Sequence, residues 1–196
     1  MLIKRLVTGI VLMLFAAGPV LAMDTYVIDK AHSSVGFSVK HLVISKVKGT
    51  LDDVSATVTY DEKDITKSSV NVVIQSSSID TDNERRDNHL RSADFLDIET
   101  YPEITFKSKK IEKANEGYVA IGDFTMHGVT KEIALPFTIT GTIIDPSGNT
   151  KMGVESLITV KRSDYGLTWN QPLEAGGVLV SDEVDIELYL ELGKQQ

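Results

Sequence analysis

Apolar and polar residues alternate with a period of two along most of the chain. The pattern is clear at residues 54–60, where Val54, Ala56 and Val58 are separated by polar residues. Successive side chains of a β-strand point to opposite faces, so this alternation predicts strands that are buried on one face. It predicts eight strands, at residues 35–39, 54–60, 70–74, 104–106, 118–126, 133–139, 154–160 and 184–190.

Short polar connections separate the predicted strands. The connection at residues 145–149, Asp-Pro-Ser-Gly-Asn, combines a proline that fixes φ with glycine and asparagine, which tolerate positive φ. Eight antiparallel strands with short connections form either a sandwich or an up-and-down barrel, and the pattern alone does not decide between them. Pro136 lacks an N–H donor, so we expect it at an edge, at a bulge or where its nitrogen faces outward.

One segment, residues 83–97, breaks the period of two. Its spacing predicts a short helix of about two turns with a charged face, on which Asp87 and Arg91 lie four residues apart. An ion pair between these two side chains would contribute a few tenths of a kcal/mol. Leu90 and Phe95 are expected to point inward. A short helix inserted between the strands of a barrel closes one end or packs across its mouth.

The first 22 residues have the features of a secretory signal peptide. Lys4 and Arg5 form a positive n-region, an apolar run follows at residues 6–17, and we expect cleavage after Ala22. The alternative is an uncleaved membrane anchor, but the apolar run is shorter than the roughly 20 residues that span a bilayer. We therefore expect no stable membrane insertion, and a single exported domain at residues 23–196.

Charge and cysteine content exclude several classes of function. The net charge is −8, and removal of residues 1–22, whose only charges are those of Lys4 and Arg5, moves it to −10. Such a chain is a poor match for nucleic acid and for anionic membrane surfaces, so we expect a neutral or locally steered partner. With no cysteine, the chain has no disulfide, thiolate chemistry or cysteine metal site, and its stability must come from packing and sheet hydrogen bonds.

Four segments, in order along nearly the whole mature chain, resemble the YceI family, named for its polyisoprenoid-binding members. They are Ile28-Asp29 with His32-Ser33 and the run VGFSVKHL at 35–42, then Arg86-Asp87 with HLRSADF at 89–95, Tyr101-Pro102 with Ile104-Thr105-Phe106 and Ser108, and GDFTMHGVTK at 122–131. The chain departs from the family pattern in one place, because the basic residue and proline expected after Gly-Val-Thr appear as Lys131-Glu132, with the proline displaced to Pro136.

The resemblance implies a fold, a location and a function. The fold is all-β, a lipocalin-like, eight-stranded antiparallel β-barrel with a short helical insertion, and the location is the periplasm. The interior would hold the hydrophobic tail of an isoprenoid-type lipid, polyprenyl or quinone-like, with its polar head towards an opening. Burial of each five-carbon isoprene unit contributes roughly 3–4 kcal/mol before ordering costs. The expected function is a binding or carrier protein that needs no cofactor.

Candidate ligand-binding residues follow from these expectations. Large apolar side chains from different strands would line the tunnel: Phe37, Val39, Phe95, Phe106, Phe124, Met126 and Trp169. Arg86, His89 and Arg91 are candidates for the head group, since guanidinium groups match phosphate oxygens through paired hydrogen bonds. Alternatively, the aromatic residues are plain core and the charged residues form a solvated helix face; a quinone head would need no positive charge.

Two enzyme-like alternatives find little support in the spacing of residues. A metal site built from His32, His41, His89 and His127 lacks any metal-binding spacing, so we expect no metal. A serine hydrolase using Ser33 or Ser92 lacks a Gly-x-Ser-x-Gly elbow, so we expect no catalytic residues and no enzyme activity.

A filled barrel is the strongest alternative to a lipid carrier. It would act as a stress-related interaction module with no physiological lipid, and its strands would show the same period of two. A homodimer is plausible, because edge strands or a ligand shared across a two-fold axis would support one. The pattern of residues does not choose among these possibilities.

Overall fold

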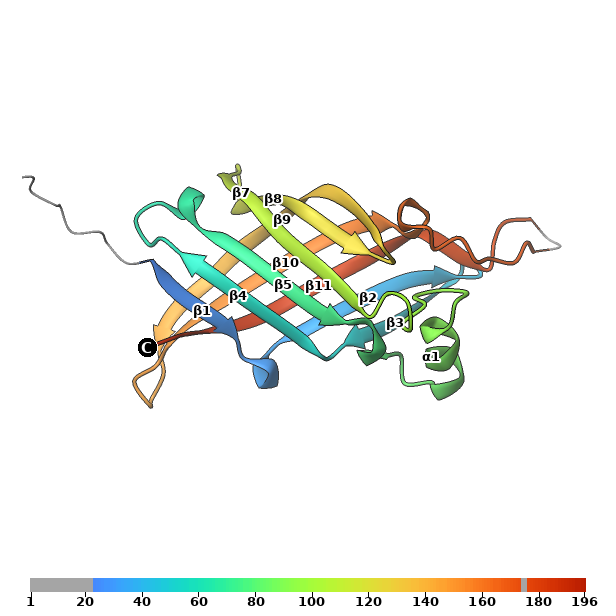
Figure 1. Cartoon of the computed structure of the whole chain (residues 1–196), viewed down its shortest axis with the longest axis horizontal. Coiled ribbons are helices and arrows are strands. Elements are labelled where there is room, and N and C mark those ends of the chain that lie inside the picture. Colours follow the sequence, from blue (N-terminus) through green and yellow to red (C-terminus); the bar gives the residue numbers. More distant parts are fainter. Residues whose placement is uncertain (1–22, 174–175) are drawn as a thin grey trace, which may run out of the picture.

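The computed structural model describes residues 23–173 and 176–196, and it confirms the predicted fold class. The expected cleavage site after Ala22 lies outside the described residues. Eight strands close an antiparallel barrel in the order β1-β4-β5-β7-β8-β9-β10-β11, and β11 pairs back onto β1 (Figure 1). These strands are β1 (Asp24–Ile28), β4 (Val54–Tyr60), β5 (Ser69–Gln75), β7 (Glu103–Lys113), β8 (Tyr118–Met126), β9 (Val129–Ile144), β10 (Thr150–Lys161) and β11 (Val180–Lys194).

The eight barrel strands differ from the eight predicted strands in one member. The predicted strand at 35–39 lies within β2 (Ser34–His41), which pairs with β11 beyond the point where β1 ends. The ring is instead closed by the five-residue β1, which the pattern did not reveal. β1 and β2 run successively along the same edge of β11, separated by the short 3-10 helix η1 (Lys30–His32).

Two further strands extend the sheet beyond β2. β3 (Ser45–Leu51) pairs with β2, and the two-residue β6 (Ile79–Asp80) pairs with β3. Gly49 permits this arrangement, because a Cβ there would lie 2.6 Å from both the Phe37 ring and the backbone oxygen of Asp80. The hairpin of β2 and β3 therefore forms a flap of sheet at one end of the barrel.

Pro136 lies in the middle of β9 but at a local edge, as predicted. β9 pairs with β8 along its first half, including Pro136 with Val119, whereas its pairing with β10 begins at Thr138. On the β10 side, the carbonyl of Pro136 accepts a hydrogen bond from the Ser156 hydroxyl at 2.6 Å. The missing N–H of proline therefore interrupts no ladder on that side.

The predicted helix is α1 (Glu84–Arg91), and Asn83 caps its N-terminus by accepting a hydrogen bond from the Arg86 N–H. The predicted Asp87–Arg91 ion pair was wrong. Asp87 is buried and accepts hydrogen bonds from the backbone N–H and the hydroxyl of Thr81. No helix among the described residues is both long and apolar enough to cross a bilayer.

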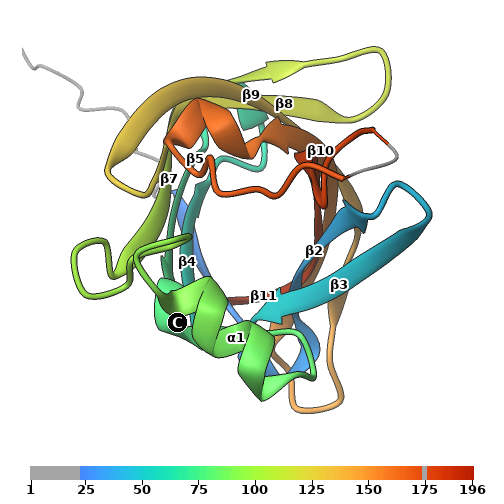
Figure 2. The same ribbon diagram turned by 90° about the vertical axis from the view of Figure 1, so that its right-hand side faces the viewer.

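The two ends of the barrel are built differently. At the end near the C-terminus, Tyr26, Met152 and Leu192 are almost completely buried and fill the interior, and we call this the filled end. The other end carries α1, the β2–β3 hairpin and η4 (Arg162–Tyr165), and we call it the α1 end (Figure 1). Viewed from this end, α1 and the η4 segment lie across the barrel from each other (Figure 2).

Candidate ligand-binding cavity

A cavity of about 210 Å³ lies inside the barrel. All eleven strands contribute side chains to its wall, which is apolar except for one arginine among the described residues. An apolar cavity of about 150 Å³ stays dry and binds benzene, so this space is large enough for a hydrocarbon ligand. The interior side chains of the barrel therefore do not fill it.

The cavity runs along the barrel from the filled end to the α1 end. Its floor is formed next to the filled end by Ile28 and Leu190, which pack on the buried cluster of Tyr26, Met152 and Leu192. At the α1 end, its wall is completed by parts of β2 and β11 and by residues outside the strands: Val39, Val180, Leu90, Phe95 and Leu167.

Most of the apolar residues that were predicted to line a tunnel lie in the cavity wall. Six of the seven apolar residues predicted to line a tunnel do line the cavity: Phe37, Val39, Phe95, Phe106, Phe124 and Met126. The seventh, Trp169, lies behind the wall, with its ring centroid 5.0 Å from that of Phe95 and 4.9 Å from that of His89. Trp169 thus supports Phe95 from outside the cavity formed by the described residues.

The two arginines proposed for a head group bind the backbone instead. Arg86 donates from Nε to the Thr81 hydroxyl and from Nη2 to the Thr81 carbonyl, both at 2.7 Å. Arg91 donates from Nε to the Ser77 carbonyl at 2.9 Å and from Nη2 to the Ile79 carbonyl at 2.5 Å. Neither side chain belongs to the cavity wall that the described residues form. Both guanidinium groups tie α1 to the segment that precedes it.

His89 likewise lies outside this wall, on the outer side of Phe95. Its Nε2 atom is 2.9 Å from Oδ2 of Asp94, and its ring meets the Phe95 ring edge-on at a centroid distance of 5.0 Å. Ser92, considered above as a nucleophile, donates its hydroxyl to the His89 carbonyl rather than to the imidazole ring. This geometry fixes the end of α1 and contains no activated serine.

The charged residue of the cavity wall is Arg162, which the sequence reasoning missed. Arg162 is only 6% exposed and follows β10. Its Nε donates to the Ser181 carbonyl at 2.9 Å and its Nη1 to the Leu167 carbonyl at 2.6 Å. Within the described chain, Nη2 makes no hydrogen bond. Burial lowers the pKa of Arg162, and the charge of Asp182 opposes that shift.

The sequence contained a signal for Arg162 that the period of two could have revealed. Ile158 and Val160 of β10 both face the cavity, and Arg162 is the next residue in the same phase. The alternation therefore predicts that residue 162 points inward. The predicted strand at residues 154–160 stops one step short of it, because the apolar residues end at Val160.

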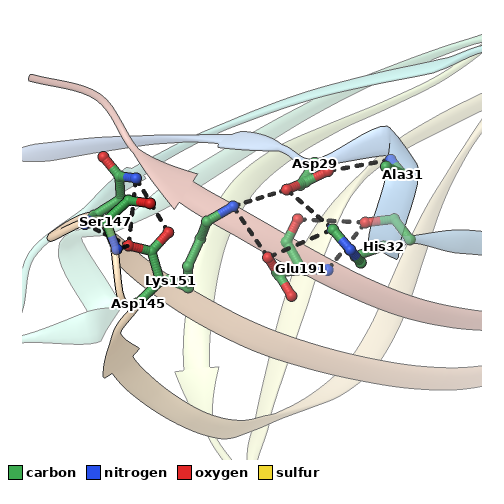
Figure 3. Close-up of polar contacts among 9 residues, drawn as sticks. Asp29, Ala31, His32, Asp145, Ser147, Lys151 and Glu191 are labelled. Atoms are coloured by element: carbon green, nitrogen blue, oxygen red, sulfur yellow. Dashed lines mark hydrogen bonds and ion pairs between the residues drawn. The ribbon is translucent and has the colours of Figure 1, made fainter.

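A group of possible metal ligands lies on the outer surface near the filled end. Asp29, His32 and Glu191 bring their ligand atoms within 4.8 Å of one another. The ammonium group of Lys151 already lies 2.7 Å from Asp29 and 3.0 Å from Glu191 (Figure 3). The hydrogen bond from Lys151 is the main cause that lowers the pKa of Asp29 to about 2. This cluster therefore has an internal cation that compensates its carboxylates.

The fold and cavity define a class of protein: a closed, eight-stranded antiparallel barrel of lipocalin type with an apolar internal cavity. The YceI-like domain matches residues 26–192, so the chain belongs to the YceI family. A UPF0312 protein of Serratia proteamaculans is 40% identical over 171 residues, which cover 85% of this chain and 88% of the relative.

Solved structures share the architecture. The Campylobacter jejuni YceI protein is 35% identical, with a TM-score of 0.69, and the match covers 86% of this chain and 97% of that protein. A polyisoprenoid binding domain from Saccharophagus degradans is 16% identical, with a TM-score of 0.62 and coverage of 87% and 98%. At that identity, the second likeness concerns the fold alone.

Proposed function

We propose that this protein is a periplasmic carrier that holds the tail of an isoprenoid-type lipid in its barrel and performs no chemistry on it. The observation that carries this proposal is the apolar cavity of about 210 Å³. Membership of the YceI family supports it, as does the fold shared with a polyisoprenoid binding domain. A periplasmic location and a homodimer both stay predictions.

The size of the cavity sets the length of tail that it can enclose. If about 150 Å³ accommodates the six carbons of benzene, the cavity of about 210 Å³ accommodates roughly eight carbons, between one and two isoprene units. Burial of roughly eight carbons contributes about 6 kcal/mol. Association costs at least about 4 kcal/mol, so this contribution alone gives weak binding. A longer tail must therefore shift half-buried wall side chains.

Arg162 gives the cavity a charged side chain that can bind the ligand head. Two of its nitrogens are held by carbonyls, so the guanidinium is fixed in place and its Nη2 atom can donate to an oxygen of the ligand. A phosphate or a quinone carbonyl provides such an acceptor. In this arrangement the tail lies towards Leu190 and the head towards the α1 end, where the ligand enters and leaves.

The test combines lipid analysis with a titration. An organic extract of natively purified protein is analysed by mass spectrometry, and we expect an isoprenoid-type lipid in it. Delipidated protein is then titrated with geraniol, farnesol and geranylgeraniol, each one isoprene unit longer than the last. Trp169, the single tryptophan, reports binding by its fluorescence because it packs on Phe95 of the cavity wall. Affinity should increase with tail length.

A filled-cavity variant provides the control. Val72→Phe/Val184→Phe places two bulky rings in the cavity, and it should abolish binding of every alcohol in the series. Leu157→Phe adds the same kind of ring on the outer face, where Leu157 is exposed, and it should bind like the wild type. Equal binding by both variants would exclude a ligand in the barrel.

A further inference from the structure

Four apolar side chains project into solvent together at the α1 end. Leu42, Val43 and Ile44 form the turn between β2 and β3, and Val43 and Ile44 are 69% and 86% exposed. Val178 is also exposed and belongs to the segment beside this turn, where the Leu42 N–H donates to the Leu179 carbonyl at 2.9 Å. We call Leu42, Val43, Ile44 and Val178 the apolar tip.

The turn of the apolar tip has an unfavourable backbone conformation. Leu42 and Val43 have φ values of +52° and +67°, in the left-handed region that glycine or asparagine normally occupies. A β-branched valine is a particularly poor choice there, and a side chain exposed to water gains little from folding. The turn therefore keeps large apolar residues where folding stability favours small polar ones. Such a position points to a contact outside the folded chain.

The apolar tip adjoins the cavity. Val39 and Val180 line the cavity, and His41, which precedes the tip, pairs with Val180. The hairpin of β2 and β3 projects from the same end of the barrel as α1 (Figures 1 and 2). A surface that contacts the apolar tip would therefore lie next to the end where the proposed ligand enters.

The charges around the apolar tip indicate what kind of external surface it contacts. The hairpin from Ser34 to Leu51 carries Lys40, Lys46 and Lys48 and no acidic residue, in a chain whose net charge is −8. The adjacent stretch of β11 carries the acidic residues Asp182, Glu183, Asp185 and Glu187. Asp185 pairs with Lys46 at 3.0 Å, whereas Lys40 and Lys48 make no ion pair among the described residues. An apolar tip flanked by lysines matches a bilayer, with its hydrocarbon below a layer of anionic head groups.

We propose that the apolar tip docks on the surface of a lipid bilayer and turns the α1 end of the barrel towards the membrane. The lipid tail then passes between bilayer and cavity without crossing bulk water. This inference deepens the proposed function and rests on it for its purpose. The docking is peripheral and reversible, since the tip is a single turn and its neighbour, and the barrel itself stays outside the bilayer.

The test uses vesicles of phosphatidylcholine and phosphatidylglycerol in equal parts, with binding measured by flotation of the full mature chain. Val43→Ser/Ile44→Ser should reduce vesicle binding at least tenfold. Ile143→Ser/Ile144→Ser is the matched control, because these two residues are 66% and 73% exposed at the end of β9, just before the turn to β10 at the filled end. This control should bind vesicles like the wild type.

Three results would overturn the docking. They are no flotation of the wild type, an equal loss in both double variants, and a change of oligomeric state caused by Val43→Ser/Ile44→Ser in the absence of vesicles, which would assign the tip to a second copy of the chain. Farnesol binding is measured on all variants and should not change. If farnesol fails to bind any of them while flotation still depends on the tip, the carrier function fails and the docking stands.

Discussion

Strands β10 and β11 run from the filled end of this barrel to the α1 end, but the side chains around them are packed differently at the two ends. At the filled end, Tyr26, Met152 and Leu192 are buried to 3%, 2% and 2% exposure, and the Tyr26 and Tyr60 rings meet edge-on. Towards the α1 end, residues such as Ile158 and Ile186 face the cavity and are only partly buried. The filled end therefore leaves no space for a ligand, whereas the buried cluster beyond it, which includes Phe124 and Val160, borders the cavity.

Strand β10 shows this difference in packing along its own length. Met152 and Ile158 both point inward, six residues apart, and both obey the period of two. Met152 contacts other side chains on all sides, whereas part of the Ile158 surface already faces the cavity. The alternation of residues thus determines which face of a strand is internal. It does not determine whether the internal face is packed, because that depends on the width of the barrel at each level.

The largest effect we predict comes from truncating these two residues. Met152→Ala should lower the free energy of unfolding by about 2–5 kcal/mol, since it opens a void in a close-packed region. Ile158→Ala should cost about half as much or less, because the removed methyl groups have fewer partners to lose. Urea unfolding followed by circular dichroism measures both values. Equal losses would mean that the two ends are packed alike.

The extent of the sheet was only partly predictable from the sequence. The strands with regular alternation were found, whereas β1, β3 and β6 were missed. β3 contains Lys46, Lys48 and Gly49 and lies on a flap rather than in the ring, and β6 has only two residues. β6 has a single buried apolar residue, Ile79, and five of the seven residues of β3 are polar or glycine, so neither strand shows an alternation. A single-sequence pattern therefore has little to detect in them.

The apolar residues of the cavity wall were more predictable than its one charged residue among the described residues, Arg162. Apolar residues in the inward phase located six wall positions correctly, but the head-group candidates were chosen because they clustered on one predicted helix. Arg86 and Arg91 use their donors on nearby carbonyls, whereas Arg162 brings a guanidinium into the wall from the end of β10. Arg86, like Arg162, uses only two of its three guanidinium nitrogens within the described chain, so the difference lies in which guanidinium reaches the cavity.

The second prediction concerns Arg162. Arg162→Gln should weaken binding of farnesyl phosphate about tenfold or more relative to farnesol, because a hydrogen bond to a charged group contributes about 1.5–3 kcal/mol. The measurement is the ratio of the two dissociation constants within the same variant. A general disturbance of the α1 end would weaken both ligands by the same factor, and that result would assign Arg162 a structural role only.

The third prediction separates Arg91 from Arg162. Arg91→Met keeps an unbranched apolar stem of similar reach to Nε and removes the hydrogen bonds to Ser77 and Ile79. We expect a loss of about 1–2 kcal/mol in the free energy of unfolding, since two backbone carbonyls lose a charged donor. The ratio of farnesyl phosphate to farnesol affinity should not change. A changed ratio with unaltered stability would restore Arg91 as a head-group contact.

The smallest effect we predict is a pH dependence that belongs to the filled end. The pKa of Asp29 is about 2 in the folded protein, mainly because Lys151 donates a hydrogen bond to it, against 3.8 ordinarily. A lowered pKa means that the unfolded chain binds the proton more readily. Ionised Asp29 therefore stabilises the folded protein fully above about pH 4, and this contribution is lost as the pH falls from there towards 2. Asp29→Asn keeps an acceptor for the Ala31 N–H and removes the charge.

The difference between wild type and Asp29→Asn isolates this contribution from the other carboxylates that titrate in the same range. The urea midpoint of the wild type should fall more steeply than that of the variant between pH 4 and pH 2, and the gap between the two curves should narrow. Lys151→Met, which removes the ammonium group that lowers the pKa of Asp29, should flatten the slope in the same way. Because Asp29 joins the bend after β1 to Lys151 of β10, parallel curves would mean that this ionic contact does not stabilise the filled end.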